Sequence, residues 1–422
     1  MKIAIKKGRV IDPANHLDKI ADLAVENGKI THVGELPADF HPEKIIDAEH
    51  KWVIPGLVDI CCRPQVQHPH GTTLHDEALA AIKRGITSLC IPPDGDPIID
   101  NTANALRLKQ QSDHALPSIY PIGALTAQLA GTAIADLTAL SQAGCVAFSN
   151  AQHPIVDLQI LKHCYDYAAS FDLLVVIQPQ DYWLSKKGVA HEGFVATLLG
   201  LPGIPEVAET IAIAQHLLLI EQCNVRAHFT NLSTLRGVQQ IQEAKARGLK
   251  VSADTAMHML HLTEMDVKSF DANCHLYPPL RSIQDCEGLL QGVVNGTLDA
   301  ICSDHRPLDT VAKLAPFGDT VPGISTIDTF LALGIHLVHQ NKLPLNRLVD
   351  ALTHRPAQLF NLPAGTLSVG AAADISIIDP SRYWVINDSS LLSKGKNTPF
   401  KHWEIPGQVT HTLCKGLLVH EA

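Results

Sequence analysis

The sequence lacks an excess of basic residues, and it lacks any long apolar run. Its 422 residues include 33 Lys and Arg against 43 Asp and Glu, which gives a formal net charge of −10. A nucleic-acid-binding surface needs clustered positive charge, so we expect no nucleic-acid partner. The longest strongly apolar stretch lies near 211–220 and contains Gln215 and His216, whereas a membrane helix needs roughly 20 apolar residues. The first residues, MKIAIKKGRVIDP, contain no apolar signal core, and we expect a cytoplasmic protein with no membrane partner.

Paired cysteines are also missing. The 10 cysteines include no Cys-x-x-Cys pair and no short disulfide framework, and most of them lie in apolar runs such as SLCIPP and DAICSD. We therefore expect buried, reduced thiols. Together with 23 histidines, however, the cysteines form a large stock of potential metal ligands. Their positions along the fold decide whether a metal site exists.

The two ends of the chain have the pattern of short β-strands. Near the N-terminus, KIAIKKGRVID and DLAVENGKITHVG alternate apolar and polar residues around Glu26-Asn27-Gly28, which predicts a hairpin turn. Near the C-terminus, GTLSVGAAADISIIDP and QVTHTLCKGLLVH look similar. We expect residues 1–53 and 363–422 to form one small β-sandwich domain.

The middle of the chain, residues 54–362, alternates apolar runs with helical patterns. The runs are LVDICC (57–62), SLCIPP (88–93), SIYPIG (118–123), CVAFSN (145–150), LLVVIQ (173–178), VRAHFT (225–230), KVSADT (250–255) and LDAICS (298–303). Amphipathic segments such as 233–246 and 282–294 separate most of them. This alternation predicts an α/β fold in which a parallel sheet closes as a (β/α)8 TIM barrel. A doubly wound open sheet is the alternative, but no GxGxxG or Walker loop follows any run.

In such a barrel, functional residues follow the C-terminal ends of the strands. The residues that we place there are Cys61, Cys62, Arg63, Gln65, Pro92, Pro93, Asp94, Asn150, Gln178, His228, Asp254, Asp304 and His305. Several of these positions belong to longer motifs, and the motifs resemble those of the dihydroorotases of the amidohydrolase superfamily. The motifs are IPGLVDI (54–60), GCVAFSN (144–150), YPPLRS (277–282), NGTLDAICSDHRP (295–307), APFG (315–318), GTLSVGAAADISIIDP (365–380) and KNTPFKHWE (396–404).

The resemblance implies a metal site in which a metal-activated hydroxide attacks a cyclic amide. Its expected ligands are a strand-1 His-x-His, an Asp after strand 4, histidines after strands 5 and 6, and an Asp after strand 8. The matching positions in this sequence are, in that order, Cys61 and Arg63, Asn150, Gln178, His228 and Asp304. Only His228 and Asp304 keep the expected residue type, as remnants of a catalytic site.

The replacements argue against a metal. Asn150 and Gln178 are uncharged amides, and Arg63 has no lone pair to offer and a permanent charge. Repulsion between that charge and a metal cation at about 4 Å is roughly 4 kcal/mol. We therefore expect no metal cofactor and no catalysis, and we predict that Asp304 neutralises Arg63, directly or through water. The alternative is one zinc ion held by Cys61, His228 and Asp304, with water as the fourth ligand.

The positions that the resemblance assigns to the substrate have changed as well. They are Gln65, Asp94 (or Pro93), Tyr277 and Leu308. Two further sets of residues remain as alternatives. His68 and His70 are a displaced metal pair or ordinary loop histidines, and His258, His261 and His275 follow strand 7 without a spacing that demands a metal. Asp94 and Asp254 as new catalytic carboxylates complete the alternatives.

Two classes of function follow. The first is a dihydroorotase-like protein that has lost catalysis and serves as a structural partner of the aspartate transcarbamoylase catalytic chain in pyrimidine biosynthesis. This partner is implied by resemblance to inactive dihydroorotase-like chains of some bacteria, and self-association is expected too. The second is an active cyclic amide hydrolase that converts dihydroorotate to N-carbamoyl-aspartate with a reduced or rearranged zinc site.

Overall fold

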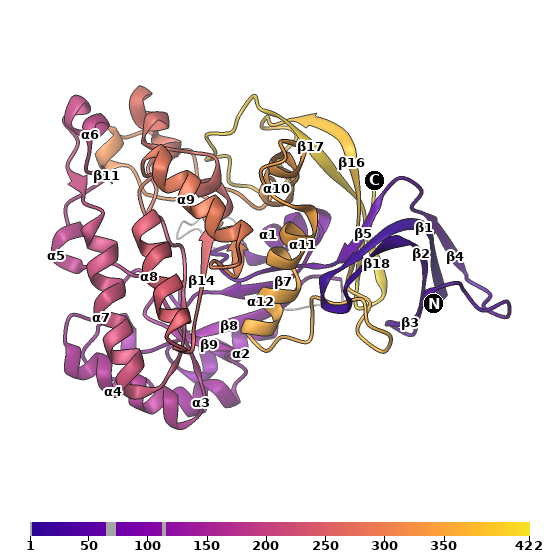
Figure 1. Cartoon of the computed structure of the whole chain (residues 1–422), viewed down its shortest axis with the longest axis horizontal. Coiled ribbons are helices and arrows are strands. Elements are labelled where there is room, and N and C mark those ends of the chain that lie inside the picture. Colours follow the sequence, from indigo (N-terminus) through magenta and orange to yellow (C-terminus); the bar gives the residue numbers. More distant parts are fainter. Residues whose placement is uncertain (1, 65–72, 112–114) are drawn as a thin grey trace.

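The fold is a parallel barrel with a smaller β-domain at one side (Figure 1). It is known from a computed structural model, which describes residues 2–64, 73–111 and 115–422. The barrel strands lie in the order β6-β7-β8-β9-β10-β13-β14-β15. Their bounds are β6 (Leu57–Asp59), β7 (Ile86–Ile91), β8 (Ser118–Ala124), β9 (Ala147–Ser149), β10 (Leu174–Ile177), β13 (Arg226–Phe229), β14 (Val251–Ala256) and β15 (Ala300–Cys302). Each overlaps one predicted apolar run, so the barrel prediction is confirmed.

The seam between β6 and β15 nearly closes the barrel. The two strands join through a bridge between Cys62 and His305 just beyond their ends, where the Arg63 N–H donates to the His305 carbonyl over 2.8 Å. One turn deeper, the Asp59 carboxylate accepts hydrogen bonds from the Ser303 N–H and hydroxyl. This seam therefore places Arg63 and Asp304 side by side at the barrel mouth.

Helices cover the outside of the barrel. They are α1 (Leu74–Lys83), α2 (Thr102–Lys109), α3 (Leu137–Gln142), α4 (Leu158–Ser170), α7 (Val207–Cys223), α8 (Leu235–Ala246), α9 (Ile283–Val294), α10 (Phe330–His339), α11 (Leu345–Leu352) and α12 (His354–Leu359). The predicted segments 233–246 and 282–294 become α8 and α9. Each begins at a capping side chain, since Thr234 accepts from the Gly237 N–H and Ser282 forms a capping box with Asp285.

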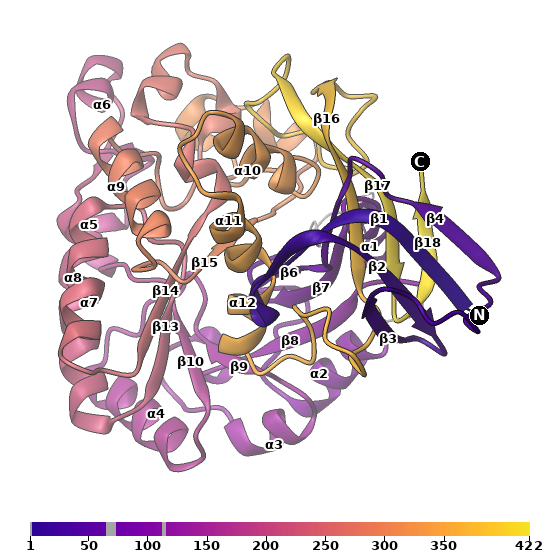
Figure 2. The same ribbon diagram turned by 45° about the vertical axis from the view of Figure 1, so that its right-hand side comes forward.

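A small insertion lies between β10 and α7. It contains α5 (Tyr182–Ser185), β11 (Ala190–His191), α6 (Phe194–Leu199) and β12 (Gly203–Ile204), and the two strands pair in parallel. Figures 1 and 2 both show α5, α6 and α7 along the edge of the barrel that is remote from the β-domain. Single-turn 3-10 helices occur elsewhere: η1 (Pro13–Asn15), η2 (Ala127–Leu129), η3 (Met257–Leu260), η4 (Glu264–Ser269), η5 (Ala272–Cys274), η6 (Val311–Lys313) and η7 (Phe317–Asp319).

The β-domain is built from both ends of the chain, as predicted. Its strands lie in the order β18-β17-β16-β5-β1-β2-β3, with β4 paired to β1. The bounds are β1 (Lys2–Asp12), β2 (Leu17–Glu26), β3 (Lys29–Gly34), β4 (Lys44–Asp47), β5 (Trp52–Pro55), β16 (Ile375–Val385), β17 (Glu404–Cys414) and β18 (Leu417–Glu421). Asn27 and Gly28 form the predicted turn with φ of 51° and 80°. The boundaries at 53/54 and 362/363 stay predictions, and β5 extends across the first.

Each domain has its own hydrophobic core, one filling the barrel and its helices and one filling the β-domain. All ten cysteines are free thiols, and only Cys223 and Cys286 are partly exposed. Within the described part of the chain, no helix is long and apolar enough to cross a membrane.

Candidate functional site

Arg63 lies at the centre of a buried ion-pair cluster at the barrel mouth. Its Nε is 2.9 Å from Asp94 Oδ2, and its Nη1 is 2.9 Å from Asp304 Oδ1. The same Nη1 lies 3.3 Å from the Cys61 sulfur. The three charged side chains are between 9% and 12% exposed. The predicted neutralisation of Arg63 by Asp304 is confirmed, and Asp94 is a second counterion that the sequence analysis had assigned to the substrate.

The two carboxylates of the cluster differ in their pKa values. Burial raises the pKa of Asp304 to about 6, against the opposing effects of Arg63 and Asn231. Burial also acts on Asp94, but Arg63 outweighs it and lowers the pKa of that carboxyl below its ordinary value. The reason is geometric, because Arg63 Nε lies within hydrogen-bond distance of both Asp94 oxygens. Burial opposes the charge of Arg63, yet its anionic neighbours raise its pKa well above the ordinary value.

Asn231, rather than His228, completes this cluster from β13. Asn231 follows the strand with a positive φ of 57°, and its Nδ2 donates to Asp304 Oδ1 over 3.0 Å. The same amide nitrogen lies 3.7 Å from the Cys61 sulfur. The sequence analysis did not single out Asn231. Its signal is its place just beyond the apolar run 225–230, where a site residue of a barrel belongs.

The placement of His228 at the site is therefore corrected. His228 lies within β13, not after it, and is fully buried in the barrel interior. Its Nε2 is 2.8 Å from Asp254 Oδ2 and its Nδ1 is 2.8 Å from the Ser252 hydroxyl. Asp254 in turn accepts from the Asn231 N–H over 2.8 Å. The structure thus holds His228 and Asp254 in a polar network one layer below Cys61 and Asp304.

Asn150 and Gln178 follow β9 and β10 as predicted, but they have different surroundings. The Asn150 side chain accepts from the Thr126 hydroxyl and donates to two carbonyls, of Leu129 and His153, so it ties loops together. Gln178 lines a small inner cavity with Cys61 and Arg63, and neither of its side-chain polar atoms has a partner within the described residues. That cavity has a volume of about 10 Å³, close to the space that one water molecule requires.

The remaining predicted residues lie away from the cluster or outside the described part of the chain. Leu308 is buried, and its N–H donates to Asn397 Oδ1. Tyr277 is half-buried, and burial raises the pKa of its phenol. His258 and His261 are enclosed near η3, and His275 Nδ1 lies 2.7 Å from the Thr320 hydroxyl. Gln65, His68 and His70 lie outside the described residues.

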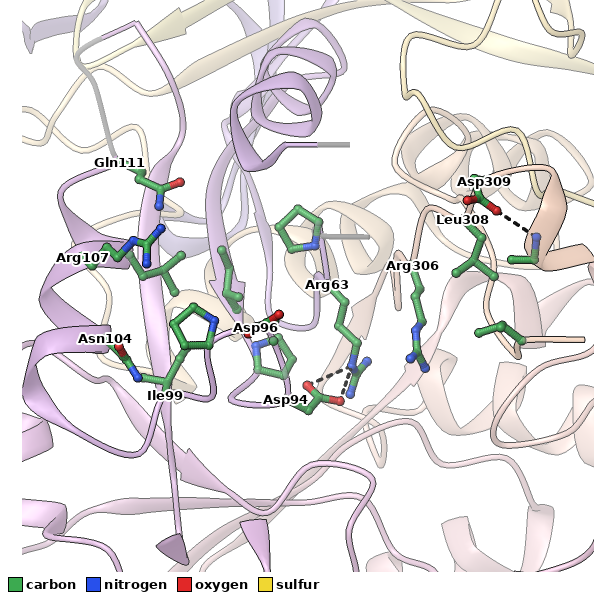
Figure 3. Close-up of a pocket in the computed structure, with 18 of the residues that line it drawn as sticks. Arg63, Asp94, Asp96, Ile99, Asn104, Arg107, Gln111, Arg306, Leu308 and Asp309 are labelled. Carbon is green, nitrogen blue, oxygen red and sulfur yellow. Dashed lines mark hydrogen bonds and ion pairs between the residues drawn. The ribbon is translucent and has the colours of Figure 1, made fainter. Parts of the chain in front are cut away.

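A larger cavity of about 290 Å³ opens beside the inner one (Figure 3). Its walls come from the end of β7, from α2 and from the segment 306–321. Three arginines and three aspartates line it, with apolar side chains between them; the charged residues are Arg63, Arg107, Arg306, Asp94, Asp96 and Asp309. Arg63 and Pro92 line both cavities, so the Arg63–Asp94 ion pair stands between the outer space and Cys61.

The residues present do not fit a metal ion. Among the described residues, no group of three or more His, Cys, Asp and Glu is placed to hold one. Cys61 and Asp304 are close together, but a guanidinium lies against both of them. The third proposed ligand, His228, directs both ring nitrogens to other partners. The set Cys61, His228 and Asp304 is therefore not assembled around one point.

Comparison with known proteins agrees with the geometry of the fold. The amidohydrolase family matches residues 73–419. The chain is 43% identical to a dihydroorotase-like protein of Pseudomonas aeruginosa over the full length of both chains. It is 37% identical to a dihydroorotase of Anaeromyxobacter dehalogenans, covering 99% of this chain and 97% of that one. An L-hydantoinase structure from Arthrobacter aurescens superposes with a TM-score of 0.88 at 23% identity, covering 99% and 96% of the two chains, which shows a shared fold. The chain therefore belongs to the amidohydrolase family and, within it, to the dihydroorotase-like proteins.

Proposed function

We propose that this chain is a catalytically inactive dihydroorotase-like protein that acts in pyrimidine biosynthesis as a structural partner of aspartate transcarbamoylase. The observation that carries the loss of catalysis is the Arg63 guanidinium, bound to Asp304 and to the Cys61 sulfur. These are positions at which the resemblance implies a metal and its ligands. The name of the 43% identical relative in Pseudomonas aeruginosa, dihydroorotase-like protein, is in keeping with this function.

Electrostatics oppose metal binding at this place. A divalent cation would have to displace Arg63, and the displacement would leave Asp94 without its buried counterion. Breaking a buried ion pair on one side costs about 3–5 kcal/mol. Beyond that cost, Asn150, Gln178 and Asn231 offer only neutral amides where the metal would need anionic or imidazole ligands.

Space opposes substrate binding at the same place. The cavity next to Cys61 and Gln178 measures about 10 Å³, which cannot hold a pyrimidine ring. The larger cavity is separated from it by Arg63 and Asp94. A cyclic amide in the outer space would contact the ion pair rather than an activated water. The barrel and both cores are nevertheless intact, as a structural role requires.

The test combines metal content with turnover. Protein purified without added zinc should contain far less than one zinc per chain and should not hydrolyse dihydroorotate above the uncatalysed rate. The double variant Cys61→His/Arg63→His should also stay inactive, because Asn150, Gln178 and Asn231 remain. Stoichiometric zinc together with turnover that Asp304→Ala abolishes would contradict the proposal.

A further inference from the structure

The outer face of α5, α6 and α7 is apolar and exposed to solvent. It consists of Trp183, Phe194, Leu198, Val207, Ile211, Ala214 and Leu218, and we call it the α5–α7 face. Trp183 is 70% exposed, Phe194 74% and Leu218 69%. Between residues 193 and 220, all of which the structure describes, every exposed residue is uncharged. The neighbouring α8 is different, since its exposed residues include Arg236, Gln239 and Glu243.

The exposed side of α7 has the spacing of a helix–helix seam. Val207, Ile211, Ala214 and Leu218 follow one another at intervals of four, three and four residues, so they form one stripe along the helix. The opposite side of α7 is apolar as well and packs into the barrel, with Ile213, Leu217 and Ile220 buried. A helix that is hydrophobic all round is normally buried on every side. The barrel itself covers only one side of α7.

We propose that a second copy of this chain covers the α5–α7 face across a two-fold axis, with the two α7 helices packed against each other. A stripe with this spacing is complementary to itself, because the side chains of one helix fit the gaps of the other. Two-fold contacts bring the same surface of each copy together, so like charges would repel across it. The absence of exposed charge between 193 and 220 removes that repulsion.

The size of the face matches such a contact. Its apolar side chains expose on the order of 700 Å², close to the roughly 800 Å² that each partner contributes to a standard interface. Trp183 is held in place before binding, since its ring lies edge-on to Tyr182 at 4.9 Å and the Lys186 ammonium is 5.1 Å from its centre. Pre-ordered aromatic side chains commonly supply much of an interface's affinity, and Lys186 provides a polar rim.

Sedimentation velocity of the chain alone, at micromolar concentration and without aspartate transcarbamoylase, tests the proposal. The wild-type chain should sediment as a dimer or as a larger even-numbered assembly. Leu218→Glu should weaken the dimer by roughly a hundredfold or more, because the two-fold axis places the new charge in the contact twice. Leu106→Glu is the matched control. Leu106 is 45% exposed on α2, outside the face, and its variant should sediment as the wild type does.

Thermal unfolding separates this effect from misfolding. Because Leu218 is largely exposed, the isolated Leu218→Glu monomer should keep its helical circular dichroism and unfold cooperatively. If that variant is misfolded, Ala214→Gln, which adds bulk without charge at the centre of the stripe, takes its place in the same measurement. A wild-type chain that is monomeric alone, or one that associates only when aspartate transcarbamoylase is added, would overturn the proposal. So would a dimer that these folded variants leave intact. None of these results depends on whether the chain hydrolyses dihydroorotate.

Discussion

Arg63 holds a permanent positive charge among three acceptors, Asp94, Asp304 and the Cys61 sulfur. The sequence predicted the contact with Asp304 because a buried guanidinium needs a counterion. It did not predict Asp94 as the second counterion, since the conformation of the loop after β7 is not encoded in any period. His228 was placed wrongly because the end of an apolar run does not fix which residue is the last in the strand. Asn231, three residues later, occupies the position that His228 was expected to have.

The raised pKa of Asp304 makes stability depend on pH. A carboxyl whose pKa is higher in the folded chain stabilises the fold at low pH, and that contribution is lost as the pH rises through its folded pKa of about 6. The difference from the ordinary value of 3.8 corresponds to about 3 kcal/mol. Asp304→Asn, which resembles the protonated carboxyl, should therefore match the wild type near pH 4 and should gain stability relative to it by up to about 3 kcal/mol near pH 7.

Urea unfolding at intervals between these two pH values measures this difference. Asp388→Asn is the control, since Asp388 is largely exposed and its pKa is lowered, chiefly by the hydrogen bond to Lys401. A lowered carboxyl pKa affects stability only below the ordinary value, so this variant should track the wild type across the range. A constant difference between Asp304→Asn and the wild type at all pH values would show that Asp304 does not titrate in this window.

At the scale of elements, the sequence predicted what has a clear period or a strong end signal. The eight barrel strands are continuous apolar runs, and α8 and α9 begin at Thr234 and Ser282, which are typical caps. The insertion with α5, β11, α6 and β12 was not predicted, because elements of two to six residues are too short to show a period. The outward face of α7 was not predicted either, since a helix apolar on all sides does not reveal which side is buried.

Glu209 shows how one element is fixed to the next. It is a buried residue of α7 whose carboxylate accepts hydrogen bonds from the backbone N–H groups and the hydroxyls of Ser233 and Thr234, at the start of α8. Burial raises the pKa of Glu209, and these partners with Arg281 oppose that effect. Glu209→Ala should lower the free energy of unfolding by about 3–5 kcal/mol, because it leaves several buried donors unpaired.

Glu206 provides the comparison for this prediction in the same denaturation experiment. It lies three residues earlier, at the N-terminal cap of α7, with no side-chain capping hydrogen bond. Glu206→Ala should therefore change the free energy of unfolding by less than about 0.5 kcal/mol. Equal losses for the two alanine variants would mean that the hydrogen bonds to the start of α8 contribute little.

At the scale of the whole molecule, the chain keeps the frame of an enzyme around a centre that has changed. The terminal strands still form the β-domain, and its sheet is joined across β5 to β16, so the two ends of the chain are fixed beside the barrel. Catalysis requires only a few side chains at the strand ends, whereas a partner protein contacts an outer surface that the whole fold must hold in shape. A chain that serves as a structural partner therefore has reason to retain both cores while its buried centre closes.

The proposed partnership predicts a complex with the aspartate transcarbamoylase catalytic chain of the same organism. Mixed at micromolar concentration, the two chains should sediment together faster than either does alone. Arg63→Met should still enter the complex if it folds, because Arg63 is buried and cannot contact a partner directly. Leu218→Glu distinguishes the two surfaces: a complex that forms normally places the transcarbamoylase away from the α5–α7 face, whereas one that is lost makes dimer formation a precondition for assembly. Two wild-type chains that sediment independently at every ratio would remove the partner from the proposed function, and the inactive barrel would then need a different role.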